Sequence, residues 1–319
     1  MQKKFKILVI TPIDHIPNVK KNLKKLGIVK IIEDPIFNDL KKIIHKYDVI
    51  FTNPNKSKIF IGKEILRFSK KLKIICTAST GTNHLDNELI KSKGIKIISL
   101  TKDLKIIKKI PSTAELAFTL TLCSLKNIMP AIISVKKNQW DYLPYVGNQL
   151  KNKKVGIVGL GRLGTIYARY CKAFGAEIMY YDPKIANKKY TKLKSINSIF
   201  KSCDIISLHI HVNNKTKNLI NRKNLSLAKK DLILINTSRG EIINEKDLID
   251  FLKKNKKAKF AADVISDEIN SKKSKHKLIK YSKKNKNIII TPHIGGMTIE
   301  AQSIAYNRIV DRLKNKKFN

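Results

Sequence analysis

The stretch KVGIVGLGRLG at residues 154–164 constrains the fold more than any other, because it joins an apolar strand-like run directly to a helical pattern. Gly159, Gly161 and Gly164 have the spacing G-x-G-x-x-G. At a strand-to-helix junction the first glycine permits a tight turn, the second lets a phosphate approach the backbone, and the third allows close packing. The helix start, at Arg162 and Leu163, adds free N–H donors and the positive end of the helix dipole. The stretch predicts a dinucleotide-binding turn, and a plain βα turn is the alternative.

Asp182 ends the next strand-like run, MYYDP at 179–183, about 20 residues beyond the glycine turn. A carboxylate in this place accepts a hydrogen bond from the ribose 2′-hydroxyl and repels a 2′-phosphate. It therefore favours NAD over NADP. An Asp before a proline also commonly begins a turn, so cofactor preference is a hypothesis here.

Short β-branched runs alternate with amphipathic helical patterns on both sides of this motif, which is typical of parallel sheets covered on both faces. A chain of 319 residues also exceeds the size at which one core usually divides, about 250 to 300 residues. We therefore expect an α/β protein of two domains. The expected strands begin near residues 5, 29, 48, 72, 95, 154, 177, 204, 231, 259 and 287.

Two segments depart from the alternation. Residues 112–140 form a long helical pattern that opens with a Ser-x-x-Glu capping box, Ser112 with Glu115, and that Pro130 is expected to kink or divide. The Lys/Ser-rich residues 270–286 are expected to form a mobile loop.

The formal net charge of +42 favours anionic partners. Nearly all of the excess is lysine, since only seven arginines occur, and it is spread along the chain. A nucleic-acid site usually concentrates arginine and aromatic residues in one patch, so we expect a solvated surface and no dedicated nucleic-acid role. Without a run of about 18 apolar residues or a signal peptide, we also expect a soluble, cytoplasmic protein with no membrane partner.

The four cysteines are far apart and form no CxxC pair, so we expect neither a zinc cluster nor a disulfide framework, and no metal site. They are Cys76, Cys123, Cys171 and Cys203.

Polar residues follow three later strands, in NTSRGEIINE (236–245), AADVISDE (261–268) and TPHIGG (291–296). Ligands of open α/β sheets bind outside the carboxyl ends of the strands, where these segments fall. An arginine, an acid and a histidine converging there would supply a carboxylate anchor, a partner for imidazolium and an acid/base group. A purely structural histidine at 293 would need neither of the other two.

These blocks resemble, in order and spacing, the signatures of the D-isomer-specific 2-hydroxyacid dehydrogenases: G-x-G-x-x-G, N-x-x-R-G, D-V-x-x-x-E and P-H-I-G. The resemblance implies that Arg239 grips the substrate carboxylate and polarises the adjacent carbonyl. Glu268 would hydrogen-bond His293 and favour its charged form. His293 would protonate the carbonyl oxygen during hydride transfer, or accept the hydroxyl proton in reverse.

The resemblance also places further residues against ligands. Asp263, His209, Thr237, Ser238 and Gly295 would line the cofactor. Backbone N–H groups of a loop in the N-terminal half would bind the substrate carboxylate, at Thr80, Gly81 and Thr82.

Some positions depart from the family pattern or look unremarkable. The FTNPNKS segment at 51–57 offers Asn53, Asn55 and Lys56 where many relatives have an arginine, so substrate identity stays open. The histidines in lysine-rich or loop contexts are expected at the surface, namely His15, His45 and His276.

By the same resemblance, residues 1–103 and 292–319 would form a flavodoxin-like substrate domain, and residues 104–291 a Rossmann NAD-binding domain. The 112–140 helix would join two copies into a homodimer through the NAD-binding domain. The implied function is NAD-dependent interconversion of a small anionic D-2-hydroxy acid and its 2-keto acid, of phosphoglycerate or hydroxypyruvate/glyoxylate type. The alternative is a non-catalytic, NAD-sensing scaffold or corepressor-like protein on the same fold.

Overall fold

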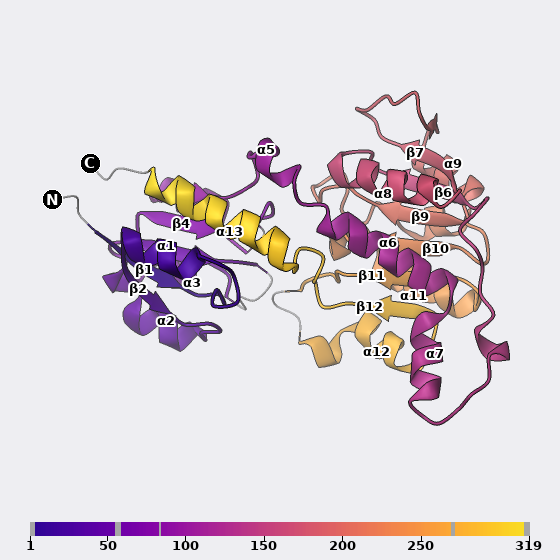
Figure 1. Ribbon diagram of the computed structural model, residues 1–319, viewed down its shortest axis with the longest axis horizontal. Coiled ribbons are helices and arrows are strands. Elements are labelled where there is room, and N and C mark those ends of the chain that lie inside the picture. Colours follow the sequence, from indigo (N-terminus) through magenta and orange to yellow (C-terminus); the bar gives the residue numbers. More distant parts are fainter. Residues whose placement is uncertain (1–3, 55–58, 83, 269–271, 316–319) are drawn as a thin grey trace. The chain divides into compact units, whose positions relative to one another are not determined.

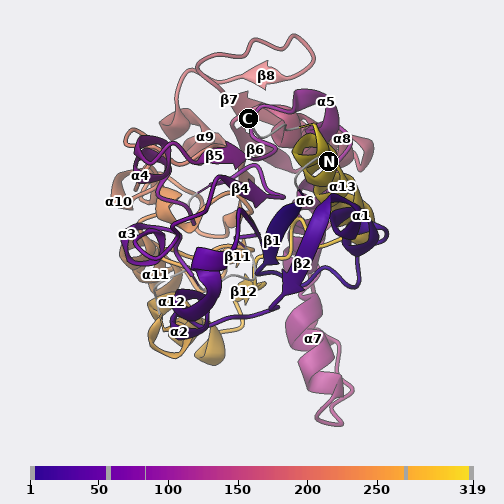
Figure 2. The ribbon, with the colours of Figure 1, turned by 90° about the vertical axis from the view of Figure 1, so that its left-hand side faces the viewer.

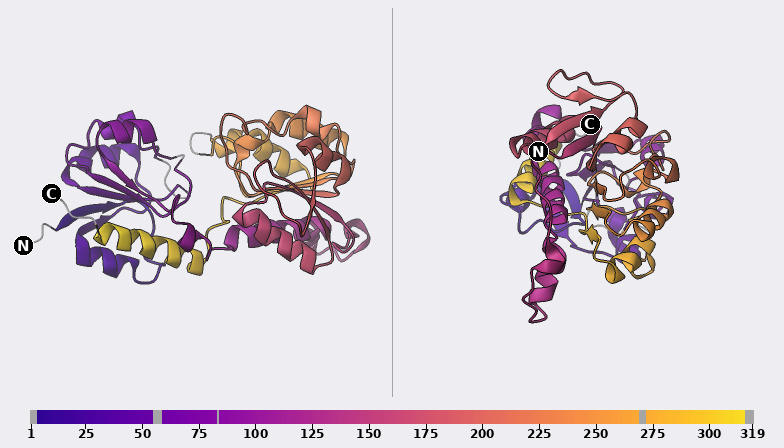
Figure 3. Two further views of the ribbon diagram at one scale, coloured as in Figure 1. Left: turned by 90° about the horizontal axis from the view of Figure 1, so that it is seen from above. Right: turned by 90° about the vertical axis from the view of Figure 1, so that its right-hand side faces the viewer.

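The computed structural model describes residues 4–54, 59–82, 84–268 and 272–315 (Figure 1). The chain divides into two compact units, Met1–Ile110 with Gly296–Asn319, and Pro111–Gly295. Boundaries expected from the sequence alone lay at residues 103 and 291. Each unit contains one parallel sheet with helices on both faces, which confirms the predicted α/β class with two doubly wound sheets (Figures 1 and 3).

The first unit has a five-stranded sheet of order β2-β1-β3-β4-β5, the flavodoxin-like order. All its strand pairs are parallel. Its strands are β1 (Phe5–Val9), β2 (Gly27–Ile31), β3 (Val49–Thr52), β4 (Ile74–Thr77) and β5 (Lys96–Ile98). Its helices are α1 (Val19–Leu26), α2 (Phe37–Ile43), η1 (Ile44–Lys46), α3 (Lys63–Leu66), α4 (Asn87–Ser92), α5 (Leu104–Ile107) and α13 (Ile299–Lys314).

Continuous apolar strands explain why this sheet is covered on both faces. Ile7 and Val9 of β1 pack in one buried cluster with Ile309 of α13. Leu8, the residue between them, points to the opposite face and packs with Leu40 of α2. Alternate side chains of one strand thus serve two cores, as in parallel sheets generally.

The second unit has a seven-stranded sheet of order β12-β11-β10-β9-β6-β7-β8. Its order reverses at β6, where ligands of doubly wound sheets bind. Its strands are β6 (Lys154–Val158), β7 (Glu177–Tyr181), β8 (Thr191–Lys192), β9 (Ile205–Leu208), β10 (Ile233–Asn236), β11 (Lys259–Ala262) and β12 (Ile288–Ile290). Its helices are α6 (Ser112–Leu125), α7 (Ile128–Val135), η2 (Leu143–Tyr145), α8 (Arg162–Ala173), α9 (Ile196–Ser202), α10 (Arg222–Leu225), η3 (Gly240–Ile242), α11 (Glu245–Lys254), η4 (Lys273–Lys275) and α12 (Lys277–Lys284).

The helical pattern at 112–140 is divided into two helices, α6 and α7, as expected, but the break does not lie at Pro130. The break lies at Lys126–Asn127, where Asn127 has a left-handed φ of 53°. Pro130 falls in the first turn of α7, where a missing N–H costs no helical bond. The predicted capping box does not form, since Pro111 is the N-cap residue and the buried Ser112 hydroxyl has no hydrogen-bond partner among the described residues.

The Lys/Ser-rich segment is another correction. Residues 270 and 271 lie outside the described part of the chain, but residues 273–284 form η4 and α12 rather than a loop. Leu278 and Tyr281 of α12 are buried against the second unit's core, which gives this basic segment an apolar anchor.

No single helix in the described ranges is long and apolar enough to cross a membrane. Leu104–Leu125 and Ile128–Val135 meet that criterion of length and composition only as a pair, which is bent by 65°.

Candidate active site

The glycine turn joins β6 to α8 at the point where the sheet order reverses. Gly159 has a φ of 92°, which favours glycine, and a Cβ on Gly164 would lie 2.2 Å from the Gly159 carbonyl oxygen. A Cβ on Gly161, in contrast, would meet nothing within 4 Å. Gly159 and Gly164 therefore close the turn, while Gly161 leaves open space beside the backbone, as a bound pyrophosphate requires.

The other two residues of the motif differ in how they are placed. The side chain of Leu163 is partly buried and packs against the core cluster under α8. Arg162 is partly buried, and burial lowers the pKa of its guanidinium.

Asp182 lies directly after β7 and supports the glycine turn itself. Its Oδ2 accepts the Leu160 N–H at 3.0 Å, and its Oδ1 accepts the N–H groups of Lys184 and Ile185 at 2.8 and 3.0 Å. A cavity of about 390 Å³ lies beside it, lined by Tyr181, Asp182, Pro183, Lys192, Leu193 and Lys194. Oδ2 accepts only one of these bonds and has further acceptor capacity for a ribose hydroxyl.

His209, just beyond β9, is held by a 2.9 Å bond between its Nε2 and Ser207 Oγ. Burial lowers its pKa to about 3, so the ring is neutral near pH 7. Ser238 donates to the Leu208 carbonyl at 2.7 Å. The Thr237 hydroxyl is buried and has no hydrogen-bond partner among the described residues. An orphaned hydroxyl beside the turn suits a bound ligand, because leaving it unpaired is costly.

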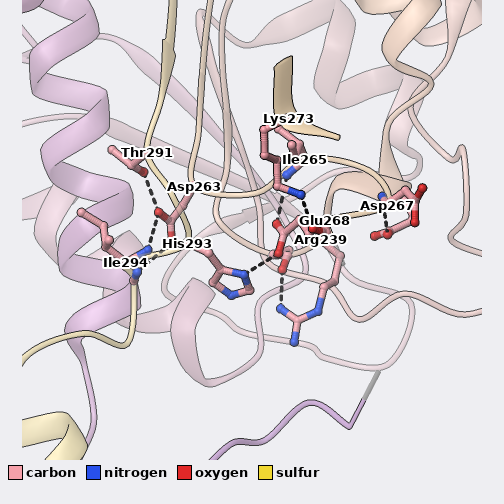
Figure 4. Close-up of polar contacts among 12 residues, drawn as sticks. Arg239, Asp263, Ile265, Asp267, Glu268, Lys273, Thr291, His293 and Ile294 are labelled. Atoms are coloured by element: carbon pink, nitrogen blue, oxygen red, sulfur yellow. Dashed lines mark hydrogen bonds and ion pairs between the residues drawn. The ribbon is translucent and has the colours of Figure 1, made fainter. Parts of the chain in front are cut away.

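Asp263 organises the turn that carries His293. Its buried carboxylate accepts the Thr291 hydroxyl at 2.5 Å and the N–H groups of Ile294 and Gly295 at 2.8 and 2.7 Å (Figure 4). Its carbonyl oxygen accepts the His293 N–H at 3.0 Å. Burial raises the pKa of the Asp263 carboxyl. In this structure Asp263 therefore holds the residue 291–295 turn.

His293 and Glu268 come together as the strand-end argument expected. His293 Nδ1 lies 2.7 Å from Glu268 Oε2 (Figure 4). Burial acts to raise the pKa of Glu268, but the hydrogen bond from His293 and the charge of Arg239 help to hold it below its usual value. An ionised carboxylate only accepts, so Nδ1 carries the proton of this bond.

His293 has a left-handed φ of 58°, which is uncommon outside glycine. Such a backbone persists only where its surroundings impose it, and it concentrates at functional sites. Here the bonds to Asp263 impose it.

Arg239 follows β10 and lies beside Glu268 and His293 (Figure 4). Its Nη1 donates to the Ser238 carbonyl at 2.6 Å, and its own carbonyl accepts the Asn236 side-chain amide at 2.9 Å. Sequence reasoning missed Asn236 as the residue that fixes this turn, although it begins the quoted N-x-x-R-G block.

The residues predicted to hold the substrate carboxylate lie in the first unit, after β4. The carbonyl of Thr80 accepts the Thr101 hydroxyl at 2.8 Å, that of Gly81 accepts the Ser79 hydroxyl at 2.7 Å, and that of Thr82 accepts the Leu85 N–H at 3.0 Å.

In the FTNPNKS segment, Asn53 is buried and donates to the Tyr306 hydroxyl at 2.8 Å. Asn55 and Lys56 lie outside the described residues.

Comparison with known proteins decides the family. Residues 118–295 match the model of the "D-isomer specific 2-hydroxyacid dehydrogenase, NAD binding domain". The chain belongs to this family. The match spans more than half of the chain and includes the glycine turn, the first two strand-end blocks and the third as far as Gly295. The NAD expected from the glycine turn is the cofactor of the matching domain, and the open backbone at Gly161 fits it.

Individual members of the family cover most of the chain. D-3-phosphoglycerate dehydrogenase of Methanocaldococcus jannaschii is 32% identical over 314 residues, which are 97% of this chain but 57% of that protein. Hydroxypyruvate reductase of Thermotoga maritima is 31% identical over 86% of this chain and 87% of its own length. The crystal structure of D-lactate dehydrogenase from Aquifex aeolicus, complexed with NAD and lactic acid, is 27% identical with a TM-score of 0.80. It covers 97% of this chain and 94% of its own.

His276 corrects one expectation of the sequence, which placed it at the surface. Its side chain is only 8% exposed and lies 3.3 Å from the carboxylate of Glu245. The lysine-rich sequence around His276 gives no sign of burial. The neighbouring lysines of α12 are indeed exposed, whereas His276 lies before the first residue of the helix.

Proposed function

We propose that the protein interconverts a small D-2-hydroxy acid and its 2-keto acid. The 2.7 Å bond between His293 Nδ1 and Glu268 Oε2 carries this proposal, because it orients the imidazole and stabilises its charged form, as an acid/base group requires. The pair follows β12 and β11 of the sheet that carries the NAD-binding turn. An ion pair with a purely structural role would need neither the neighbouring Arg239 nor the left-handed backbone of His293.

Each side chain has a role that its chemistry allows. Bound NAD supplies or accepts the hydride. His293 gives a proton to the carbonyl oxygen in reduction and takes the hydroxyl proton in oxidation. Glu268 stabilises the charged imidazole, and Arg239 pairs with the substrate carboxylate. The backbone N–H groups at 80–82 are proposed to bind the substrate carboxylate, and the first unit is proposed to act as the substrate domain.

The substrate class rests on the relatives. They include phosphoglycerate dehydrogenases, a hydroxypyruvate reductase and glyoxylate reductases, all named for small anionic acids. The chain spans about half the length of the phosphoglycerate dehydrogenases that it matches. A lysine-rich surface with a net charge of +42 would raise the local concentration of such anions.

A panel of 2-keto acids tests the function. Purified protein is mixed with NADH and glyoxylate, hydroxypyruvate, pyruvate or phosphohydroxypyruvate, and loss of nicotinamide absorbance is followed. We expect clear turnover of at least one acid. NADH binding without turnover of any acid would favour the NAD-sensing scaffold, and tight, salt-sensitive RNA or DNA binding without NADH oxidation would favour a nucleic-acid role.

Asp182 is proposed to set the preference for NAD. In Asp182→Asn the amide keeps one acceptor oxygen but loses the charge that repels a 2′-phosphate, and Lys192 and Lys194 line the adjacent cavity. We expect the ratio of kcat/KM for NADH over NADPH to fall about tenfold, or ~1.4 kcal/mol. Asp250→Asn is the matched control, because this acid is exposed and its one ion pair among the described residues is with Arg222. Equal use of both cofactors by the unsubstituted protein would remove Asp182 from this role.

Homodimerisation through the NAD-binding domain is proposed from α7 and the segment after it. In Figures 2 and 3, α7 extends away from the sheet of its own unit. Its large apolar side chains are 39% to 51% exposed, and Trp140 is 91% exposed. Exposed apolar area of this extent marks an interaction surface. In analytical ultracentrifugation we expect the unsubstituted protein to sediment as a dimer and the Ile133→Asp variant as a monomer. An unsubstituted protein that sediments as a monomer would contradict the proposal.

A cytoplasmic location is proposed from the thiols. All four cysteines are free and three are buried, which suits a reducing compartment. Cell fractionation tests this location. Recovery of the protein in the membrane fraction or outside the cell would contradict it.

A further inference from the structure

The turn that carries Glu268 is pressed against the loop that carries Arg239. A Cβ on Gly240 would lie 2.0 Å from the carbonyl carbon of Ile265 and 2.1 Å from the Ser266 nitrogen. Only glycine permits this approach, so the two loops share one backbone contact. Asp267, between Ser266 and Glu268, has a left-handed φ of 52°. The orientation of Glu268 therefore depends on how this strained turn is held.

Two further carboxylates hold the backbone N–H groups of that turn. Glu245, the first residue of α11, accepts the Ser266 N–H at 2.7 Å through Oε1. Glu241, in η3, accepts the Asp267 N–H at 3.2 Å. Burial raises the pKa of Glu245, and the Ser266 N–H acts in the opposite direction.

His276 holds the other side of Ser266. Its Nε2 lies 3.1 Å from the Ser266 carbonyl oxygen and 3.3 Å from Glu245 Oε2. A carbonyl oxygen only accepts, so Nε2 carries the proton and donates. His276 Nδ1 is buried and has no hydrogen-bond partner in the described ranges.

We infer that His276 and Glu245 form a second imidazole–carboxylate pair, whose function is to position Glu268 for its bond to His293. The pair fixes both the N–H and the C=O of Ser266, two residues before Glu268 in the chain. Neither His276 nor Glu245 takes part in the hydrogen bond between Glu268 and His293, so both are positioning residues. The inference rests on the proposed function.

Charged groups from several elements surround this turn. They are Glu241 of η3, Asp267 and Glu268 of the turn, Arg239 before η3, and Lys273 of η4, whose ammonium contacts the Glu268 carbonyl oxygen. A change in the pH dependence of kcat must therefore be measured on a variant that alters only the His276–Glu245 pair.

Matched substitutions at residue 276 separate positioning from bulk packing. His276→Leu keeps most of the volume but cannot donate to Ser266, whereas His276→Gln places an amide N–H near the position of Nε2. We expect His276→Leu to lower kcat by about 10-fold to 100-fold, as for a small misplacement of a catalytic group. It should also shift the pH midpoint of kcat, while KM for NADH stays within twofold. His276→Gln should restore most of kcat and the original midpoint.

His45→Leu is the control, because His45 is exposed on the first unit and should leave every value unchanged. Two results would overturn the inference. One is a His276→Leu variant with unchanged kcat and midpoint. The other is a His276→Gln variant as impaired as His276→Leu, since loss without rescue indicates packing alone.

A second readout does not depend on turnover. Proton NMR of the protein with ¹⁵N-labelled histidine should show a low-field resonance from His293 Nδ1–H bonded to Glu268, assigned by its loss in His293→Ala. This resonance should shift or disappear in His276→Leu and remain in His276→Gln. If no 2-keto acid is turned over, the proposed function fails while this measurement still tests positioning. An unchanged resonance in His276→Leu would exclude it.

Discussion

His293→Ala is expected to lower kcat by about 1,000-fold, with the dissociation constant for NADH changed by less than twofold. General acid–base groups typically contribute between about 100-fold and 10,000-fold to a rate. We propose His293 Nε2 as the proton-exchanging atom, because Nδ1 is bonded to Glu268 at 2.7 Å. The alanine variant leaves the glycine turn of β6 and α8 intact. Steady-state turnover and fluorescence titration with NADH measure the two quantities.

His45→Ala controls for general effects of removing a histidine, since this side chain is exposed in η1. Near-normal turnover by His293→Ala would exclude it as the acid/base group. A parallel loss of NADH binding would instead assign His293 to the cofactor site.

Arg239→Ala is expected to lower kcat/KM for the 2-keto acid by about 100-fold to 1,000-fold, as when one partner of a buried charge pair is removed. Arg239→Lys should still lose about tenfold or more, because an ammonium lacks the planar fork that binds a carboxylate through two parallel bonds. NADH binding should stay within twofold in both. Initial rates over a range of keto-acid concentrations give kcat and KM separately.

Arg222→Lys is the matched control for charge-conserving replacement. Its side chain is 74% exposed, lies in α10, and pairs with Asp247 and Asp250 at 3.7 and 3.6 Å. An Arg239→Lys variant as active as Arg222→Lys would remove bidentate carboxylate binding from the mechanism. A loss confined to kcat, with KM unchanged, would move Arg239 from substrate binding to polarisation of the carbonyl.

Local patterns explain the parts of the fold that were predictable. Continuous apolar runs such as Ile288–Ile290 indicate buried parallel strands. A helical pattern such as that of α13 repeats every 3.6 residues. The glycine turn was recognisable because each of its glycines answers a steric requirement of the backbone. These are properties of a few neighbouring residues and need no knowledge of distant partners.

Errors arose where distant contacts decide local structure. Ser112 has the spacing of a cap, yet the chain enters α6 through Pro111 and buries Ser112. α12 is rich in lysine and reads as a loop, yet Leu278 and Tyr281 anchor it on the second unit's core. Tertiary burial overrides weak local preference in both cases.

The sequence by itself determined the alternation of strands and helices, the dinucleotide turn and the residue types at three strand ends, because these follow from periodicity and backbone sterics. Only the tertiary structure decided which polar groups meet. His293 pairs with Glu268, 25 positions away in the sequence, and the Asp263 carboxylate binds the backbone of the turn around His293. His276 is buried beside Glu245. Parallel strands bring their carboxyl ends to one edge. The paths of the loops beyond that edge, set by packing, then select the partners.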